Sequence, residues 1–160
     1  MGVTTRHLQY TENESKWQKC RDAFDGGEAV KARGEMYLPK MGGQSSDDYD
    51  SYTERALYYS ATARTIQGWL GCVFRKEPQI AVPETIHQQL QDATLTIVPI
   101  EALAKTALQQ VLTIGRYGIL VDMPKEDSLE RRPYLIPFKA VCRLGRRVRR
   151  CDAPAEHRVL

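Results

Sequence analysis

Residues 47–77, DDYDSYTERALYYSATARTIQGWLGCVFRKE, form the stretch that decides the fold of this chain. Apolar and small residues recur in it at alternating steps of four and three. Residues three and four apart stack on the same side of an α-helix, so this spacing predicts one long helix over about residues 47–76. The residues that share its apolar face are Tyr52, Ala56, Tyr59, Ala63, Ile66, Leu70 and Val73.

The sequence also marks both ends of this predicted helix. Ser45 is suited to cap the first turn, and Asp48 completes a capping-box pattern three residues later. Pro78 cannot continue the helix at its other end. Gly68 and Gly71 each cost about 1 kcal/mol relative to alanine inside a helix, so we expect a bend there or a close packing partner. A core helix is the first interpretation, and a weak self-associating coiled coil is the alternative.

Shorter helices are predicted before and after this element. One covers about residues 14–25 and stops at a glycine pair, and a short one follows at about residues 28–33. Pro83 favours one or two helical turns after it. Residues 100–114 have a strong amphipathic pattern that stops at Gly115, which predicts a further helix.

The pattern changes period after Gly115. Residues 117–123 and 132–138 are apolar runs of strand length, separated by a charged, turn-prone segment. This arrangement predicts a β-hairpin over about residues 117–138. The expected fold is therefore α+β, mainly helical, with one hairpin. We expect three regions: an irregular N-terminus over 1–13, a folded body over 14–140 and an irregular tail over 141–160.

The same periodicity predicts which side chains face the core. These are Tyr59, Ala63, Ile66, Leu70, Leu103, Ala107, Leu108, Val111, Ile119 and Val121. If the apolar face within residues 52–73 proves exposed in a monomer, it is expected to be an interface with a neighbouring subunit or a missing domain. The candidate residues for a subunit interface are Tyr52, Tyr59, Ile66 and Trp69.

Charge is unevenly distributed along the chain. Residues 140–160 carry six arginines against two acidic residues, a local net charge of +4. The first 139 residues carry 17 basic and 18 acidic side chains, so the body lacks the clustered positive charge of a tight nucleic-acid binder. Any nucleic-acid contact is therefore expected in the tail. The candidate residues are Arg143, Arg146, Arg147, Arg149 and Arg150.

The sequence offers little for catalysis or membrane insertion. It has no apolar run near the ~18 residues of a membrane span, and its N-terminus lacks the apolar core of a signal peptide, which indicates a cytosolic protein or one assembled from the cytosol. The four cysteines and three histidines are too scattered for a zinc site. Phosphate-binding, hydrolase and metalloprotease motifs are missing. We predict no catalytic residue, cofactor or metal, and hence a structural or interaction protein.

The order of several segments resembles the N-terminal part of a portal-protein-like family of tailed bacteriophages and prophages. The resemblance rests on WQKCRDAFDGGEAVKARGEMYLPKM, then YTERALYYSATARTIQGWLGCVFRKEP, then VLTIGRYGILVDMP and RPYLIPFKA. These segments cover roughly Trp17 to Ala140. None of them is a catalytic signature.

The resemblance implies a non-enzymatic subunit of the homo-oligomeric ring at one capsid vertex, the head-tail connector through which DNA is packaged and ejected. It implies as partners other copies of the chain, the terminase, capsid or scaffold protein, head-completion proteins and double-stranded DNA, with no membrane. It also implies a location in the virion, and in the host cytoplasm before assembly. The helices and hairpin would belong to the outer, wing-like region of the subunit.

Two features depart from the family pattern. Family members are much longer, and AVCRLGRRVRRCDAPAEHRVL replaces the further strand and helix expected after RPYLIPFKA. Our hypothesis is that a frameshift or early stop has truncated the gene after about Ala140, which would leave an N-terminal fragment or a non-functional prophage remnant. The alternatives are a small interaction module that binds nucleic acid or a membrane surface through a genuine basic tail, and an enzyme with an unfamiliar site.

Overall fold

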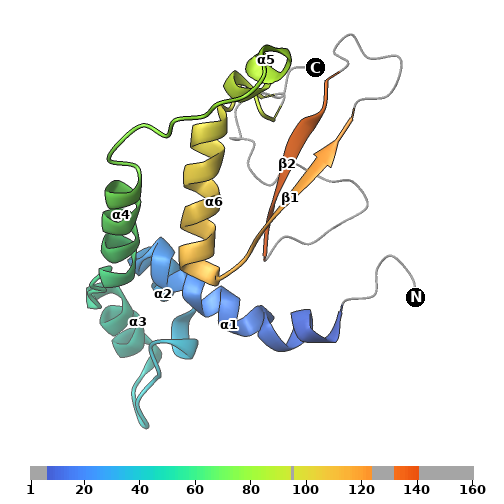
Figure 1. Ribbon diagram of the computed structural model, residues 1–160. Coiled ribbons are helices and arrows are strands. Elements are labelled where there is room, and N and C mark those ends of the chain that lie inside the picture. Colours follow the sequence, from blue (N-terminus) through green and yellow to red (C-terminus); the bar gives the residue numbers. More distant parts are fainter. Residues whose placement is uncertain (1–6, 95, 124–131, 141–160) are drawn as a thin grey trace, which may run out of the picture.

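The computed structural model describes residues 7–94, 96–123 and 132–140, and these form a mainly helical fold with one hairpin (Figure 1). The expected α+β class is confirmed. None of the described helices is long and apolar enough to cross a membrane. The helices are α1 (Leu8–Asp25), α2 (Gly27–Ala32), α3 (Ser46–Arg55), α4 (Ala61–Val73), α5 (His87–Gln91) and α6 (Ile100–Ile114), with short 3-10 turns at Gly34–Met36 and Glu84–Ile86, and the strands are β1 (Tyr117–Asp122) and β2 (Tyr134–Lys139).

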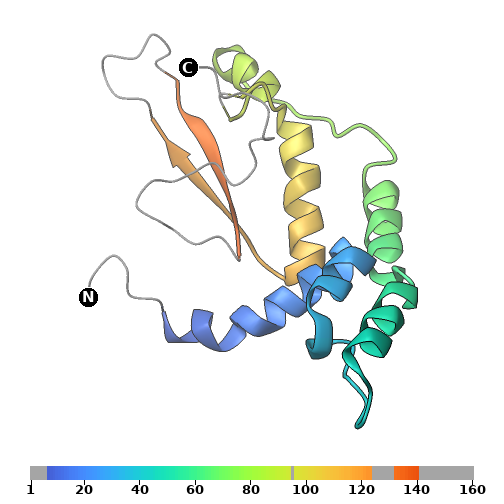
Figure 2. The same ribbon diagram turned by 180° about the vertical axis from the view of Figure 1, so that it is seen from behind.

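Helix α6 is the centre of the arrangement. It contacts α1, α4, α5 and β1. Figures 1 and 2 show α3 and α4 on one side of α6 and the hairpin on the opposite side. The apolar side chains that are buried in the described part of the chain are few: Ile66, Ala93, Leu103 and Ile114.

The prediction of one long helix over 47–76 is wrong, because the chain leaves the helix at Ala56 and enters a new one at Ala61. Tyrosine and serine are weak helix formers, so the Leu57–Ser60 segment gains little from staying helical. Contacts elsewhere in the chain stabilise the break instead.

Those contacts come from the end of α1 and the last turn of α2. The Tyr58 hydroxyl donates to the Ala23 carbonyl at 3.1 Å, and Lys31 Nζ donates to the Glu54 carbonyl, in the last turn of α3, at 2.8 Å. The tighter glycine is Gly26, because a Cβ at it would lie 3.3 Å from the Ser60 Oγ, whereas a Cβ at Gly27 would make only an ordinary contact with the Cβ of Tyr58 at 3.5 Å. Gly26, the residue between α1 and α2, thus lets Ser60 at the start of α4 approach this corner.

Other predicted helix ends are confirmed. Ser45 caps α3, with its Oγ accepting from the Asp48 N–H at 3.1 Å and donating to the Asp48 carboxylate at 2.6 Å. Gly115 ends α6 with φ of 86°, the left-handed conformation that favours glycine. Helix α4 continues through Gly68 and Gly71, and the expected close packing partner is missing among the described residues, because a Cβ at either glycine would meet no atom within 4 Å.

The N-terminal boundary also differs from the prediction. Helix α1 begins at Leu8 rather than near residue 14, and residues 8–13 of the segment predicted to be irregular are helical. His7 caps this helix, since its Nδ1 accepts from the Gln9 N–H at 3.3 Å. The predicted irregular tail over 141–160 lies outside the described residues.

The hairpin has the predicted position, with Tyr117 opposite Lys139 and Asp122 opposite Tyr134. Its burial was mispredicted, because Ile119 and Val121 are exposed. A single two-stranded sheet can be covered only by other elements, and β1 receives little cover from α6. The predicted burial of Tyr59 and Val111 is also wrong, since both side chains are exposed.

Candidate functional site

Asp22 is the one charged residue that is buried in the described part of the chain, with 3% of its surface exposed. It lies in the last turns of α1, one helical turn after Gln18, whose Nε2 donates to its Oδ1 at 2.8 Å. Gly26 ends α1 with a φ of 96° and turns the chain into α2. The segment after α2 then returns toward Asp22.

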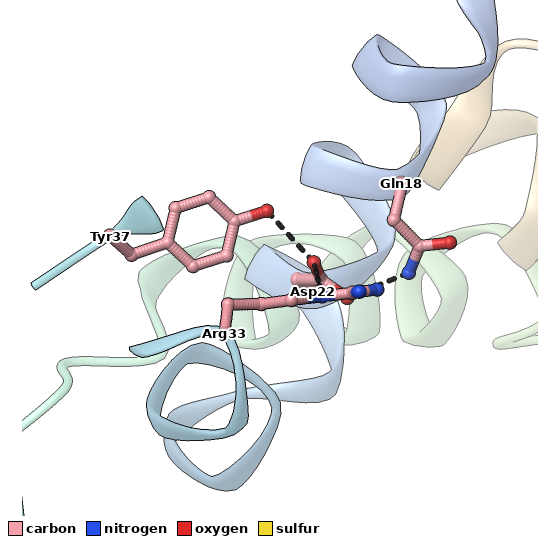
Figure 3. A network of polar contacts seen from close by, with 4 residues as sticks. All are labelled: Gln18, Asp22, Arg33 and Tyr37. Carbon is pink, nitrogen blue, oxygen red and sulfur yellow. Dashed lines mark hydrogen bonds and ion pairs between the residues drawn. The ribbon is translucent and has the colours of Figure 1, made fainter. Parts of the chain in front are cut away.

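Two side chains from that returning segment complete the cluster (Figure 3). Arg33 Nε donates to Asp22 Oδ2 at 2.9 Å, and its Nη2 lies 3.4 Å from Oδ1. The Tyr37 hydroxyl donates to Oδ2 at 2.8 Å. The carboxylate therefore ties α1 to both the end of α2 and the 3-10 turn that follows.

These contacts set the protonation of the cluster. Burial by itself raises the pKa of Asp22, but the hydrogen bonds from Arg33, Gln18 and Tyr37 and the charge of Arg33 outweigh it and hold the pKa below its ordinary 3.8. Burial, the hydrogen bond to Asp22 and its charge raise the pKa of Tyr37. Asp22 is thus a carboxylate at neutral pH, and it accepts from three side chains. This arrangement is typical of a structural clamp, because a general base needs a free lone pair directed at a substrate.

A second polar cluster holds the hairpin to the segment before α6. Arg132 forms an ion pair with Asp92 and also donates to its backbone carbonyl. Asp92 Oδ1 accepts from the Ile97 N–H at 2.8 Å. Leu135 N–H in β2 donates to the Ala93 carbonyl at 2.7 Å. Burial by itself raises the pKa of Asp92. The hydrogen bonds from Arg132 and Ile97 and the charge of Arg132 lower this pKa by more than burial raises it, so it lies below the ordinary value.

A shallow hollow lies between the extended segment after α4, α5 and the start of α6. Its volume is about 360 Å³. Its walls are mostly apolar, and His87 and Glu101 are the ionisable side chains among the residues that line it. The lining residues are Pro78, Ile80, His87, Leu90, Gln91, Pro99, Ile100 and Glu101. No group of three or more potential metal ligands occurs among the described residues.

The largest unexplained feature is exposed apolar surface on two sides of the molecule. On α4, Trp69 is 61% exposed and Val73 is exposed beside it. On β1, three consecutive residues, Ile119, Leu120 and Val121, are all exposed, although neighbouring residues of a strand point to opposite faces. Large exposed apolar patches are typical of protein or membrane interaction sites, ligand-binding grooves and aggregation-prone surfaces.

The four residues predicted for a subunit interface differ in exposure. Ile66 points into the fold and is 7% exposed, whereas Tyr59 and Trp69 are well exposed and Tyr52 is at the margin of exposure. The interface itself stays a prediction. The five tail arginines predicted for nucleic-acid contact, Arg143, Arg146, Arg147, Arg149 and Arg150, lie outside the described residues.

Sequence reasoning did not find the Asp22 cluster. A weak signal was present, because Gln18 and Asp22 are four residues apart, a spacing that puts an amide beside a carboxylate on one side of a helix. The partners Arg33 and Tyr37 could not be chosen from sequence, since they reach Asp22 only through the turn at Gly26. Comparison with known protein families and with curated proteins finds no match to this chain.

Proposed function

We propose that this chain forms a wing-like structural region of a tailed-phage portal subunit, part of the ring through which DNA is packaged and ejected. It has no enzymatic role in this proposal. Its partners are other copies of the chain, the terminase, capsid or scaffold protein, head-completion proteins and double-stranded DNA.

The uncovered apolar surface is the observation that carries the proposal. Few apolar side chains are buried in the described part of the chain, while large ones on α4 and on β1 are exposed. These two elements lie on opposite sides of α6 (Figure 2). A protein that works alone rarely leaves such surfaces open, whereas a subunit of an assembly covers them with its neighbours. The resemblance of the sequence to a portal-protein-like family indicates the kind of assembly, a ring at one capsid vertex.

The polar clusters support a structural role as well. The buried carboxylate of Asp22 has its hydrogen bonds satisfied by Gln18, Arg33 and Tyr37, and Asp92 is similarly engaged with Arg132 and Ile97. Groups with satisfied hydrogen bonds fix helix and strand positions. They are suited to holding a rigid shape in a large assembly.

Location in the particle tests the proposal. The host that carries the gene would be given a copy with an N-terminal peptide tag, and particles recovered after induction would be labelled with gold-conjugated antibody. The label is expected at one vertex, with a tagged major capsid protein as the control that labels the whole shell. Intact particles without label, or with label over the whole shell, would overturn the proposal.

The charge separation along the sequence favours a second candidate, an interaction module that binds nucleic acid through its tail. Residues 140–160 carry the net +4 that the body lacks. Deleting residues 141–160 would then abolish a salt-dependent affinity for double-stranded DNA. Under the portal proposal the deletion leaves the location of the body unchanged. Translating the genomic DNA beyond codon 140 in three frames tests whether a frameshift accounts for the tail.

A further inference from the structure

We draw no further inference here: the strongest candidate, the apolar surface of strand β1 at Ile119, Leu120 and Val121 that the described part of the chain leaves exposed, carries nothing, because nothing in the structure shows what covers it.

Discussion

The hydroxyl of Tyr58 donates a hydrogen bond to the backbone carbonyl of Ala23 at 3.1 Å, and this contact fastens the break between α3 and α4 to the end of α1. The break matters because it turns what the periodicity describes as one element into two. Helix α3 then stays at the surface, while α4 is free to place Ile66 against the interior.

Replacing Tyr58 with phenylalanine should lower the free energy of unfolding by about 0.5–1 kcal/mol, because the hydrogen bond is lost at a partly exposed site. Thermal denaturation followed by circular dichroism would measure the change. Tyr59→Phe is the matched control, since its hydroxyl is on an exposed ring and accepts only a long contact of 3.4 Å from Arg64. Equal effects of the two substitutions would contradict the role given to Tyr58.

The continuous helix was mispredicted because a period of three and four survives the break. The residues at 52, 56, 59 and 63 keep the spacing of one helix face, although residues 56–60 are not helical. Sequence shows that Tyr58, Tyr59 and Ser60 are weak helix formers, but it does not show that the Tyr58 hydroxyl reaches the carbonyl of Ala23, 35 residues earlier in the chain. Long-range contacts of this kind are outside the reach of local patterns.

Local signals were read correctly where the physical cause is local. The capping box at Ser45, the left-handed Gly115 and the two strands of the hairpin all follow from residues next to one another in sequence. The predicted burial of side chains is wrong where it depends on a second layer of structure covering the sheet. The strand pattern of Ile119 and Val121 indicates a covered face, but the described elements do not supply the cover.

Asp22→Asn tests the buried clamp. The substitution keeps the shape of the side chain but removes its charge. It also directs an NH2 group toward side chains that donate hydrogen bonds, so we expect a loss of about 2 kcal/mol in the free energy of unfolding. We expect no larger loss in the free energy of unfolding, because the Arg33 side chain is 42% exposed and water screens its charge. Urea denaturation would measure it. Asp25→Asn, at an exposed position in the same helix, should change stability by less than about 0.5 kcal/mol.

The stability of the fold should fall in acid. The pKa values of Asp22 and Asp92 are below the ordinary 3.8, so both carboxylates favour the folded state above that pH and lose their contribution as pH falls through their folded pKa values. Free energies of unfolding measured from pH 6 down to pH 2 should decline mainly below about pH 4. The decline should be shallower in Asp22→Asn. An identical pH profile for wild type and variant would contradict the assignment.

The ion pair of Arg132 with Asp92 should control the local opening of the hairpin. Arg132→Gln removes the charge, and a loss of about 1–2 kcal/mol would speed amide hydrogen exchange in β1 and β2 roughly 5- to 30-fold. Exchange in α1 and α4 should be unchanged, because the hydrogen bonds of this cluster join the hairpin to the segment before α6. Acceleration spread over all the helices would instead indicate that the substitution lowers the stability of the whole fold.

Ile97 should be replaceable with a gain in stability. Its φ of 58° is in the left-handed region, where a β-branched residue is strained, and its side chain is 85% exposed, so little packing opposes a change. Asparagine tolerates this conformation, and Ile97→Asn keeps the N–H that donates to Asp92. We expect the free energy of unfolding to rise by about 1 kcal/mol. Ile97→Val is the control, because valine keeps the branched Cβ and therefore the strain. A stabilisation by valine equal to that by asparagine would assign the effect to lower surface hydrophobicity and not to the backbone at residue 97.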